Sequence, residues 1–401
     1  MDYEVEFVSA IEAIGESDWD ALAGTDNPFT RYAFLSALEV TGCVGAETGW
    51  EPCHSVIKDL SGKVVALMPG YLKMHSYGEY VFDFAWAEAY QRHGLAYYPK
   101  WIVAIPFTPS VGPRLLICKS LAAAQQKVLV QVLMQAVQTH CERHSISSWH
   151  LLFADAVGLS CIAGSGIDYA ARMGCQYHWR NCRPDTVDVG YKSFDQFLQH
   201  LTSRKRKNIK KERQKVVSDG ITFREVTGAE ITSHDIHQFY DFYRMTYLVR
   251  GQPPYLTEAF FQSLRSRMPE QMCLLFAMQN DVVIASALFL KSADKLFGRY
   301  WGASANAQRR FGSQLNFLHF ETCYYQGIEM CIRHGLKVFD AGAQGEQKLL
   351  RGFEPVTTQS LHFVRHDGFR QAIGQFCLEE SANVNAYIDD AKGYLPYKSH
   401  Q

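Results

Sequence analysis

HSVIKDLSGKVVALMPGYLK (residues 54–73) and CLLFAMQNDVVIASALFL (residues 273–290) are the two stretches that decide the fold. Each consists of two apolar runs about a polar turn, at Ser61-Gly62 in the first and at Asn280-Asp281 in the second. This pattern predicts a β-hairpin in each half of the chain. Helices are predicted before both hairpins, over residues 18–38 and 234–268. The order of elements therefore indicates an internal duplication that sequence identity does not show.

A helix and a strand follow in each half. Residues 121–144 carry apolar side chains at helical spacing and precede an apolar run at 149–153. Residues 314–334 again predict a helix, closed by Gly335 in the position of a C′ glycine, and residues 337–340 predict the strand after it. The prediction is an α/β protein of two tandem domains with mixed central sheets, at about 1–185 and 190–401.

The first half carries an extra segment at about residues 80–114. It is dense in aromatic side chains and contains Pro99, Pro106, Pro109 and Pro113. Proline at this density interrupts regular elements, so the segment is predicted to be rich in loops. Aromatic side chains suit both a cover over a sheet edge and a wall of a binding site, and the pattern leaves both interpretations open.

The overall charge argues against a field that attracts polyanions. The 401 residues include 40 Lys and Arg and 41 Asp and Glu, which gives a formal net charge of −1. DNA is therefore not expected as a partner, and any binding to RNA or to a membrane surface must be local. Eleven single cysteines with no C-x-x-C pair favour a reduced cytoplasmic protein without a metal site.

The N-terminal residues MDYEVEFVSAIEAIGESDWD are acidic and lack the basic start and apolar stretch of a signal peptide. No apolar run approaches the roughly 20 residues that span a bilayer. We expect a cytoplasmic protein without integral membrane contact.

Residues 193–218 predict one long helix or two abutting helices, because apolar side chains recur at helical spacing from Phe194 to Val216. Eight of the twelve residues from Arg204 to Lys215 are basic. Such a run is often only a solvated helix face, but few opposite charges accompany it here. We favour a phosphate ligand, on a nucleotide or an RNA backbone, bound by Arg204, Arg206, Lys207 and Asn208.

Two glycine-containing segments near the C-terminus are candidates for chemistry. Arg309 and Gly312 lie in a predicted turn between a strand and a helix, and the first amides of a helix bind anions. FDAGAQGEQKLLRGFEP (residues 339–355) combines glycines with clustered charges, which suits acyl transfer, because the amine needs a base and the oxyanion needs donors. His319 is preferred to other single histidines because Glu321 follows on the same helix.

These segments resemble those of a known superfamily. Helices, hairpin, strand, helix, strand is the element order of the GNAT acyltransferases, and a tandem pair resembles the Fem-type aminoacyltransferases that build peptidoglycan cross-bridges. LTSRKRKNIKKERQKVVSDGITFREV (residues 201–226) and GLKVFDAGAQGEQKLLRGF (residues 335–353) are similar to Fem segments. Nearly the whole chain resembles an uncharacterised bacterial FemAB-like family, through FAWA (84–87), YYPK (97–100), PFTP (106–109), GRYWG (298–302), LHFE (318–321), CYYQG (323–327) and GAQGE (342–346).

The resemblance implies two tandem GNAT-like domains and a transferase that joins an acyl or aminoacyl group to an amine, on an acceptor such as a peptidoglycan precursor. Acyl-CoA or aminoacyl-tRNA would be the donor, and a small molecule or a muropeptide the acceptor. Two alternatives stay open. One is an acyl-CoA-dependent N-acetyltransferase of a small amine, and the other is a non-catalytic module that binds a cell-wall precursor or RNA.

The expected site residues follow from these segments. Glu346 or Glu321 would be the general base, Lys348 or the amides of residues 342–345 would oppose the oxyanion, and His319 would assist. The remaining expected substrate-binding residues are Arg299, Tyr300, Trp301, Gln344, Arg351, Asp83, Trp86, Tyr98, Lys100, Thr108 and Arg114. Arg309 and Gly312 match part of the GNAT motif that binds the CoA pyrophosphate.

Overall fold

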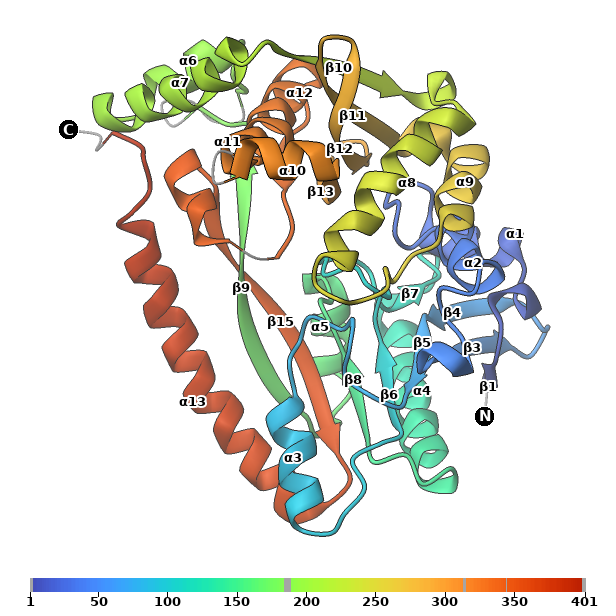
Figure 1. Ribbon diagram of the computed structural model, residues 1–401. Helices are drawn as coiled ribbons and strands as arrows, with labels where there is room; N and C mark the ends of the chain where they lie inside the picture. The colour runs from blue at the N-terminus through green and yellow to red at the C-terminus, as the bar shows by residue number, and fades with distance from the viewer. Residues whose placement is uncertain (1–2, 184–188, 313–314, 344, 399–401) are drawn as a thin grey trace. The chain divides into compact units, whose positions relative to one another are not determined.

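The computed structural model of the chain describes residues 3–183, 189–312, 315–343 and 345–398 (Figure 1). The chain divides into two compact units. Unit 1 comprises Met1–Gly174 and Thr357–Ala386, and unit 2 comprises Cys175–Val356 and Tyr387–Gln401. Strands β9 (Ala170–Arg180) and β15 (Glu354–Val364) contribute residues to both units. This division differs from the predicted contiguous domains at 1–185 and 190–401. The local sequence does not indicate that a strand near the C-terminus, β15, pairs with strands of the first half.

Unit 1 contains the first predicted hairpin, β3 (His54–Asp59) and β4 (Val64–Met68), after helices α1 (Glu16–Ala23) and α2 (Tyr32–Val40). The hairpin lies in an antiparallel sheet of order β1-β3-β4-β7, with β1 at Tyr3–Val8 and β7 at Leu116–Ile117. The other strands follow in the order β15-β8-β6-β5-β2, with β8 at Ser148–Leu151, β6 at Lys100–Val103, β5 at Gly70–Lys73 and β2 at Trp50–Pro52. Helix α4 (Ala123–Arg143) connects to β8, which runs parallel to β6.

The segment at 80–114 is more regular than the proline content predicts. It contains helix α3 (Phe84–Arg92) as well as strand β6. Both elements occupy stretches without proline, since residues 84–92 and 100–103 contain none. The prolines of this segment therefore lie outside its regular elements.

Unit 2 repeats the same order of elements. Its strands follow as β10-β11-β12-β13-β14-β9, with β10 at Ile221–Thr227, β11 at Met272–Gln279, β12 at Val282–Lys291, β13 at Lys295–Ala303 and β14 at Val338–Asp340. The second predicted hairpin is β11–β12. Its turn places Asn280 at φ +50° and Asp281 at φ +61°, the left-handed pair that a two-residue hairpin requires. Both predicted hairpins are therefore confirmed.

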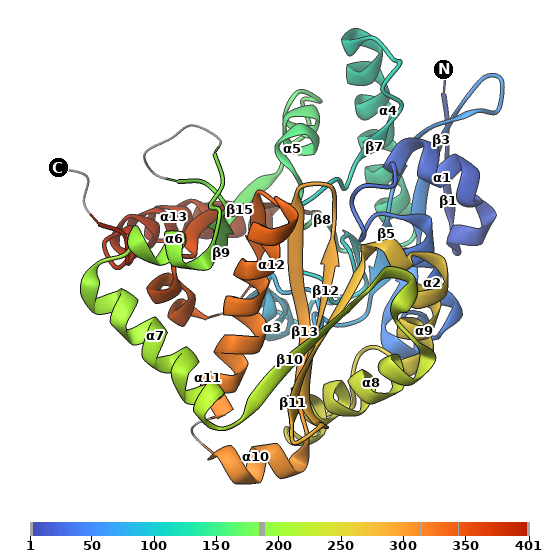
Figure 2. The same ribbon diagram turned by 90° about the horizontal axis from the view of Figure 1, so that it is seen from above.

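Helices cover both faces of the unit 2 sheet. Helices α8 (Ser233–Leu248) and α9 (Glu258–Arg267) lie on one side of β10–β13 in Figure 2, and α7 (Ser203–Ser218) and α12 (Gln326–His334) lie on the other. The predicted helix at 193–218 is present as two abutting helices, α6 (Phe194–Gln199) and α7. Buried Phe197, Leu198 and Ile209 belong to the apolar stripe that predicted them.

The predicted helix at 314–334 is present but is interrupted. Helix α11 (Leu315–Phe320) passes into a π-helical turn, η6 (Glu321–Tyr325), and then into α12. Gly335 ends α12 at φ +66°, as expected for a C′ glycine. The sequence did not predict the π turn, and such turns often occur at functional sites.

Strands β13 and β14 run parallel but soon part. They pair only between Lys295–Phe297 and Val338–Asp340. Beyond Phe297, β13 continues to Ala303, while the chain after Asp340 leaves the sheet and leads to the 3-10 helix η7 (Glu346–Arg351). The separation of two parallel strands opens a space in the centre of unit 2.

None of the helices in the described parts of the chain is both long enough and apolar enough to cross a bilayer.

Candidate functional site

A cavity of about 490 Å³ lies where β13 and β14 part. Its walls come from β12, β13, helix α11, the π turn, the loop after β14 and η7. The expected site residues Arg299, Tyr300, Trp301, His319 and Lys348 all line it. The structure thus brings together in one cavity side chains that three separate sequence motifs supplied.

The charged side chains of this cavity have one sign. Arg250, Arg299 and Lys348 line it, and none of its described lining residues is an Asp or a Glu. Such a lining favours an anion or an electron-rich carbonyl oxygen over an ammonium group. Arg250, which follows α8, is exposed and was not predicted from the sequence.

Lys348 is the buried cation of the cavity, with 1% of its surface exposed. Its Nζ donates a hydrogen bond to the carbonyl oxygen of Gly342 at 2.6 Å. Burial lowers the pKa of Lys348 to about 8, although the nearby carboxylate of Asp340 acts in the opposite direction. The side chain therefore remains mainly an ammonium group at neutral pH.

Asp340, which ends β14, fixes the loop beneath Lys348. Its Oδ2 lies 2.6 Å from Nη2 of Arg299, and its Oδ1 accepts a hydrogen bond from the amide of Gly342 at 2.9 Å. Burial would raise the pKa of Asp340, but the charge of Arg299 outweighs it and holds this pKa well below its usual range. Asp340 thus links Arg299 of β13 to the loop whose Gly342 carbonyl accepts the hydrogen bond from Lys348.

His319 contributes a neutral imidazole. Burial, and then the charges of Lys348 and Arg351, lower its pKa to about 4. The ring meets Trp301 edge to face, with centroids 4.9 Å apart. Cys323 and Tyr324 of the π turn line the same cavity. A neutral imidazole beside an ammonium group supplies a nitrogen that can accept a proton.

Glu321 and Arg351 do not line this cavity and instead hold helix α7. Glu321 accepts hydrogen bonds from Nε and Nη2 of Arg213 at 3.0 and 2.9 Å. Arg351 donates from Nη2 to both carboxylate oxygens of Glu212 at 3.0 and 2.9 Å. The two charged residues expected to be catalytic or substrate-binding are thus paired with Arg213 and Glu212 of α7.

Glu346 and Gln344, which were also expected in the site, are not among the described residues that line the cavity of Lys348. Glu346 is exposed, accepts a hydrogen bond from the hydroxyl of Tyr387 at 2.9 Å and lines a different cavity. Gln344 lies outside the described residues. The structure therefore places neither of the two expected carboxylate bases, Glu321 and Glu346, in the cavity of Lys348.

The expected phosphate ligands of α7 lie on its N-terminal half. Arg204, Lys207 and Asn208 are exposed, and Arg206 is half-buried. Among the residues that the structure describes, no acidic partner lies within ion-pair distance of Arg204, Arg206 or Lys207.

The other two residues expected to bind phosphate, Arg309 and Gly312, are arranged differently. Arg309 lies within helix α10 (Ala305–Phe311) and donates to Asn306, and Gly312 ends that helix at φ +47°. The predicted strand-to-helix turn is thus itself a short helix, and Gly312 marks its C-terminus.

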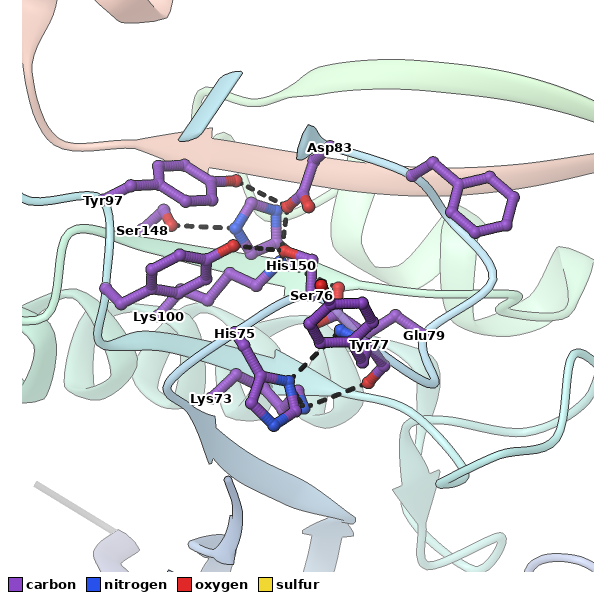
Figure 3. A network of polar contacts seen from close by, with 12 residues as sticks. Lys73, His75, Ser76, Tyr77, Glu79, Asp83, Tyr97, Lys100, Ser148 and His150 are labelled. Carbon is purple, nitrogen blue, oxygen red and sulfur yellow. Dashed lines mark hydrogen bonds and ion pairs between the residues drawn. The ribbon is translucent and has the colours of Figure 1, made fainter. Parts of the chain in front are cut away.

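In unit 1, Lys100 is the centre of a buried polar network (Figure 3). Its Nζ donates to Oγ of Ser76 at 2.9 Å, to Oε2 of Glu79 at 2.8 Å and to Asp83. The hydroxyl of Tyr97 also donates to Asp83, at 2.6 Å. Lys100 therefore pairs with one oxygen of each buried carboxylate, while Oε1 of Glu79 and Oδ1 of Asp83 are buried without a hydrogen-bond partner among the described residues.

The other expected residues of this segment are also held internally. Tyr98 shares a hydrogen bond with Ser76 at 2.8 Å, and the Thr108 hydroxyl donates to a backbone carbonyl at 3.1 Å. Trp86 packs against His362 with ring centroids 5.0 Å apart. Arg114, 1% exposed, donates to three backbone carbonyls. These contacts favour the structural interpretation of the segment, as a cover that stabilises unit 1.

Lys73, which the sequence analysis missed, is a second buried lysine in this network. Its Nζ lies 3.9 Å from the ring centre of Trp50 and donates to the carbonyl of Tyr77 at 3.3 Å. Burial lowers the pKa of Lys73 to about 7, well below the usual range of a lysine. An alternating pattern in β5 would place Lys73 on one face of the strand, but only the tertiary fold shows that this face is covered.

Lys73→Met should increase stability, and by more at pH 7 than at pH 9.5. Because the folded-state pKa is depressed, the unfolded chain binds more protons between about pH 7 and 10.5, and the wild type loses stability as the pH falls through that window. The free energy of unfolding in urea, measured for both proteins at both pH values, checks this. The exposed Lys63→Met should show no such pH dependence, and an equal difference at both pH values would contradict the assignment.

The sequence matches the FemAB-like family, described as peptidoglycan biosynthesis/recognition, over residues 10–399. The chain belongs to the FemAB-like family. This confirms the resemblance inferred from the motifs. No curated protein matches the sequence significantly.

Solved structures agree on the fold of this FemAB-like chain. It is similar to a crystal structure of FemX, with 10% identity, a TM-score of 0.51 and coverage of 92% of this chain and 100% of that chain. It is also similar to the C-terminal domain of a putative lysylphosphatidylglycerol synthetase from Agrobacterium fabrum, with 12% identity, a TM-score of 0.50 and coverage of 92% and 96%. A tandem GNAT protein from the clavulanic acid biosynthesis pathway gives 10% identity, a TM-score of 0.41 and coverage of 90% and 98%. The likeness to FemX, at a TM-score of 0.51, confirms the predicted fold class of two tandem GNAT-like domains with mixed sheets.

Proposed function

We propose that this chain joins an acyl or aminoacyl group to an amine and that the reacting carbonyl is bound beside Lys348. The observation that carries the proposal is a buried ammonium group, held by the Gly342 carbonyl, in a cavity whose described lining has no carboxylate. A preorganised cation in a water-poor cavity stabilises an oxyanion that forms during reaction.

The proposed reaction is the attack of an amine on the donor carbonyl. The amine nitrogen attacks the donor carbonyl carbon, and the carbonyl oxygen becomes an oxyanion that the Lys348 ammonium group stabilises. The bond from carbon to the leaving oxygen or sulfur then breaks and the amide forms. The nitrogen loses one proton to the neutral imidazole of His319, and the resulting imidazolium passes that proton to the leaving oxygen or sulfur.

The donor is proposed to carry phosphates. Arg204 and Lys207 are exposed on α7 with no acidic partner among the described residues, and Arg250 lines the cavity. Aminoacyl-tRNA fits this set better than acyl-CoA, because the expected pyrophosphate pair of Arg309 and Gly312 lies at the C-terminal end of α10, where the helix dipole is negative. The family description and the likeness to FemX support a peptidoglycan precursor as the acceptor.

Thermal shift with acetyl-CoA, an aminoacyl-tRNA and a UDP-linked muropeptide tests this assignment. A ligand present at about 100 times its dissociation constant stabilises the folded chain by roughly 2.7 kcal/mol. We expect a shift with the tRNA and with the muropeptide, and we expect mass spectrometry of the mixture to show a new amide.

Arg250→Met should reduce the shift caused by the charged donor, and the matched variant Arg244→Met should not, because Arg244 does not line the cavity and pairs with Asp241. A shift with acetyl-CoA alone, or no amide from any donor, would overturn the proposal.

A further inference from the structure

A second cavity, of about 370 Å³, lies beside the first in unit 2. It is lined by residues of η7, of the C-terminal end of helix α13 (Asp367–Lys392) and of the segment that follows this helix. Gln347 lines both cavities. The short helix η7 therefore presents Lys348 to the first cavity and Glu346 to the second.

The second cavity has the opposite charge to the first. Glu346 and Asp390 are the charged residues among its described lining, which therefore carries a formal charge of −2. In the described part of the chain, neither carboxylate has a cationic partner within ion-pair distance. The nearby cation of α13, Lys392, is engaged by Asp389 at 2.9 Å. Both carboxylates are exposed, so solvent compensates their charge in the free protein, and a positive ligand in the cavity would do so more directly.

The remaining lining is aromatic and apolar. It consists of Tyr387, Tyr394, Leu349, Leu350 and Ala391, together with the shared Gln347. The Tyr387 hydroxyl forms hydrogen bonds with Glu346 and with the hydroxyl of Tyr177, and these two bonds hold the Tyr387 side chain in place. Tyr394 and Leu350 are 58% and 41% exposed, which is high for large side chains of these types and leaves the cavity accessible.

Carboxylates beside tyrosine rings are the groups that bind organic cations. The ring faces attract an ammonium group, the carboxylates pair with it, and apolar side chains bury the carbon atoms attached to it. We propose that this second cavity binds a primary ammonium group carried on a short alkyl arm. Its use as the recognition site for the amine substrate rests in addition on the proposed function, because the ammonium group would then be held next to the cavity of Lys348.

Isothermal titration with n-hexylammonium chloride, with n-hexanol as the neutral probe of equal length, tests the site directly. We expect the ammonium probe to bind the wild type and the alcohol to bind at least about ten times more weakly. Glu346→Gln and Asp390→Asn should each weaken ammonium binding by about tenfold, which corresponds to the loss of one ion pair of about 1.4 kcal/mol.

Matched variants separate a local effect from a general loss of charge. Glu379→Gln and Asp389→Asn remove the same kinds of carboxylate from helix α13, outside the cavity lining, and should leave the affinity unchanged. Equal affinity for alcohol and ammonium, or equal effects of the cavity and control variants, would overturn the proposal. Neither result would bear on Lys348, because the titration requires no acyl transfer and no donor.

Discussion

Lys348→Met is expected to reduce amide formation by at least about 100-fold while the chain stays folded. Removing a single oxyanion donor typically costs a factor of about 10² to 10³ in kcat. The fold should tolerate the change, because Asp340 keeps its ion pair with Arg299 and only the hydrogen bond to the Gly342 carbonyl is lost. Single-turnover rates with the donor and acceptor identified by thermal shift provide the measurement.

The pH profile gives this prediction a second readout. Because the pKa of Lys348 is about 8, the ammonium form is present below that pH and is lost above it. Turnover of the wild type should therefore fall as the pH rises through about 8, and the residual rate of Lys348→Met should lack that step. The exposed Lys337→Met serves as the control. A variant with near-normal turnover would show that Lys348 does not stabilise the transition state.

The largest effect on stability is expected for Lys100→Met, at about 3–5 kcal/mol of unfolding free energy. The substitution removes the common partner of Glu79 and Asp83, whose side chains are only 2% and 3% exposed. The two buried carboxylates then lose the ion-pair partner that they share, and only the more distant Lys73 still acts on them. Urea denaturation of the variant and the wild type measures the difference.

The variant's loss of stability should become smaller as the pH falls. In the wild type, burial already raises the pKa of Glu79 to about 7 in spite of the adjacent Lys100. Because this folded-state pKa is raised, Glu79 favours the folded state at low pH, and that contribution is lost as the pH rises through about 7. Loss of Lys100 removes a positive charge that lowers the Glu79 pKa, so the cost of the variant is greatest at high pH.

A compensated variant distinguishes charge from packing. Lys100→Met combined with Glu79→Gln and Asp83→Asn removes all three charges, and it should recover most of the lost stability. If the triple variant is as unstable as the single one, the loss comes from packing around the lysine stem, and the electrostatic account of the network is wrong.

Part of the candidate site could be predicted from sequence, because motif residues on one strand keep a fixed spacing. Arg299, Tyr300 and Trp301 are consecutive on β13, and His319 lies on the helix that follows, so a GNAT-like order brings them near the loop after β14. Their joint presence in the first cavity agrees with that expectation.

The roles of the charged residues could not be predicted in the same way. Glu321 and Arg351 are as conspicuous in the sequence as Lys348, yet they point to Arg213 and Glu212 of α7. Which of several nearby charges faces a cavity depends on the π turn at Glu321–Tyr325 and on the turn angle of η7. Both are set by packing between elements, and neither has a distinctive local sequence pattern.

Local sequence alone determined the two hairpins, the abutting helices α6 and α7, the glycine that ends α12 and the repeated order of elements. These features depend on side-chain periodicity and turn chemistry, which act over a few residues. Only the tertiary structure decided that β15 and most of α13 belong to unit 1, that Lys100 meets Glu79 and Asp83, and that Lys348 and Glu346 line cavities of opposite charge. Those features depend on contacts between residues distant in the chain, where burial and neighbouring charges determine what each side chain does.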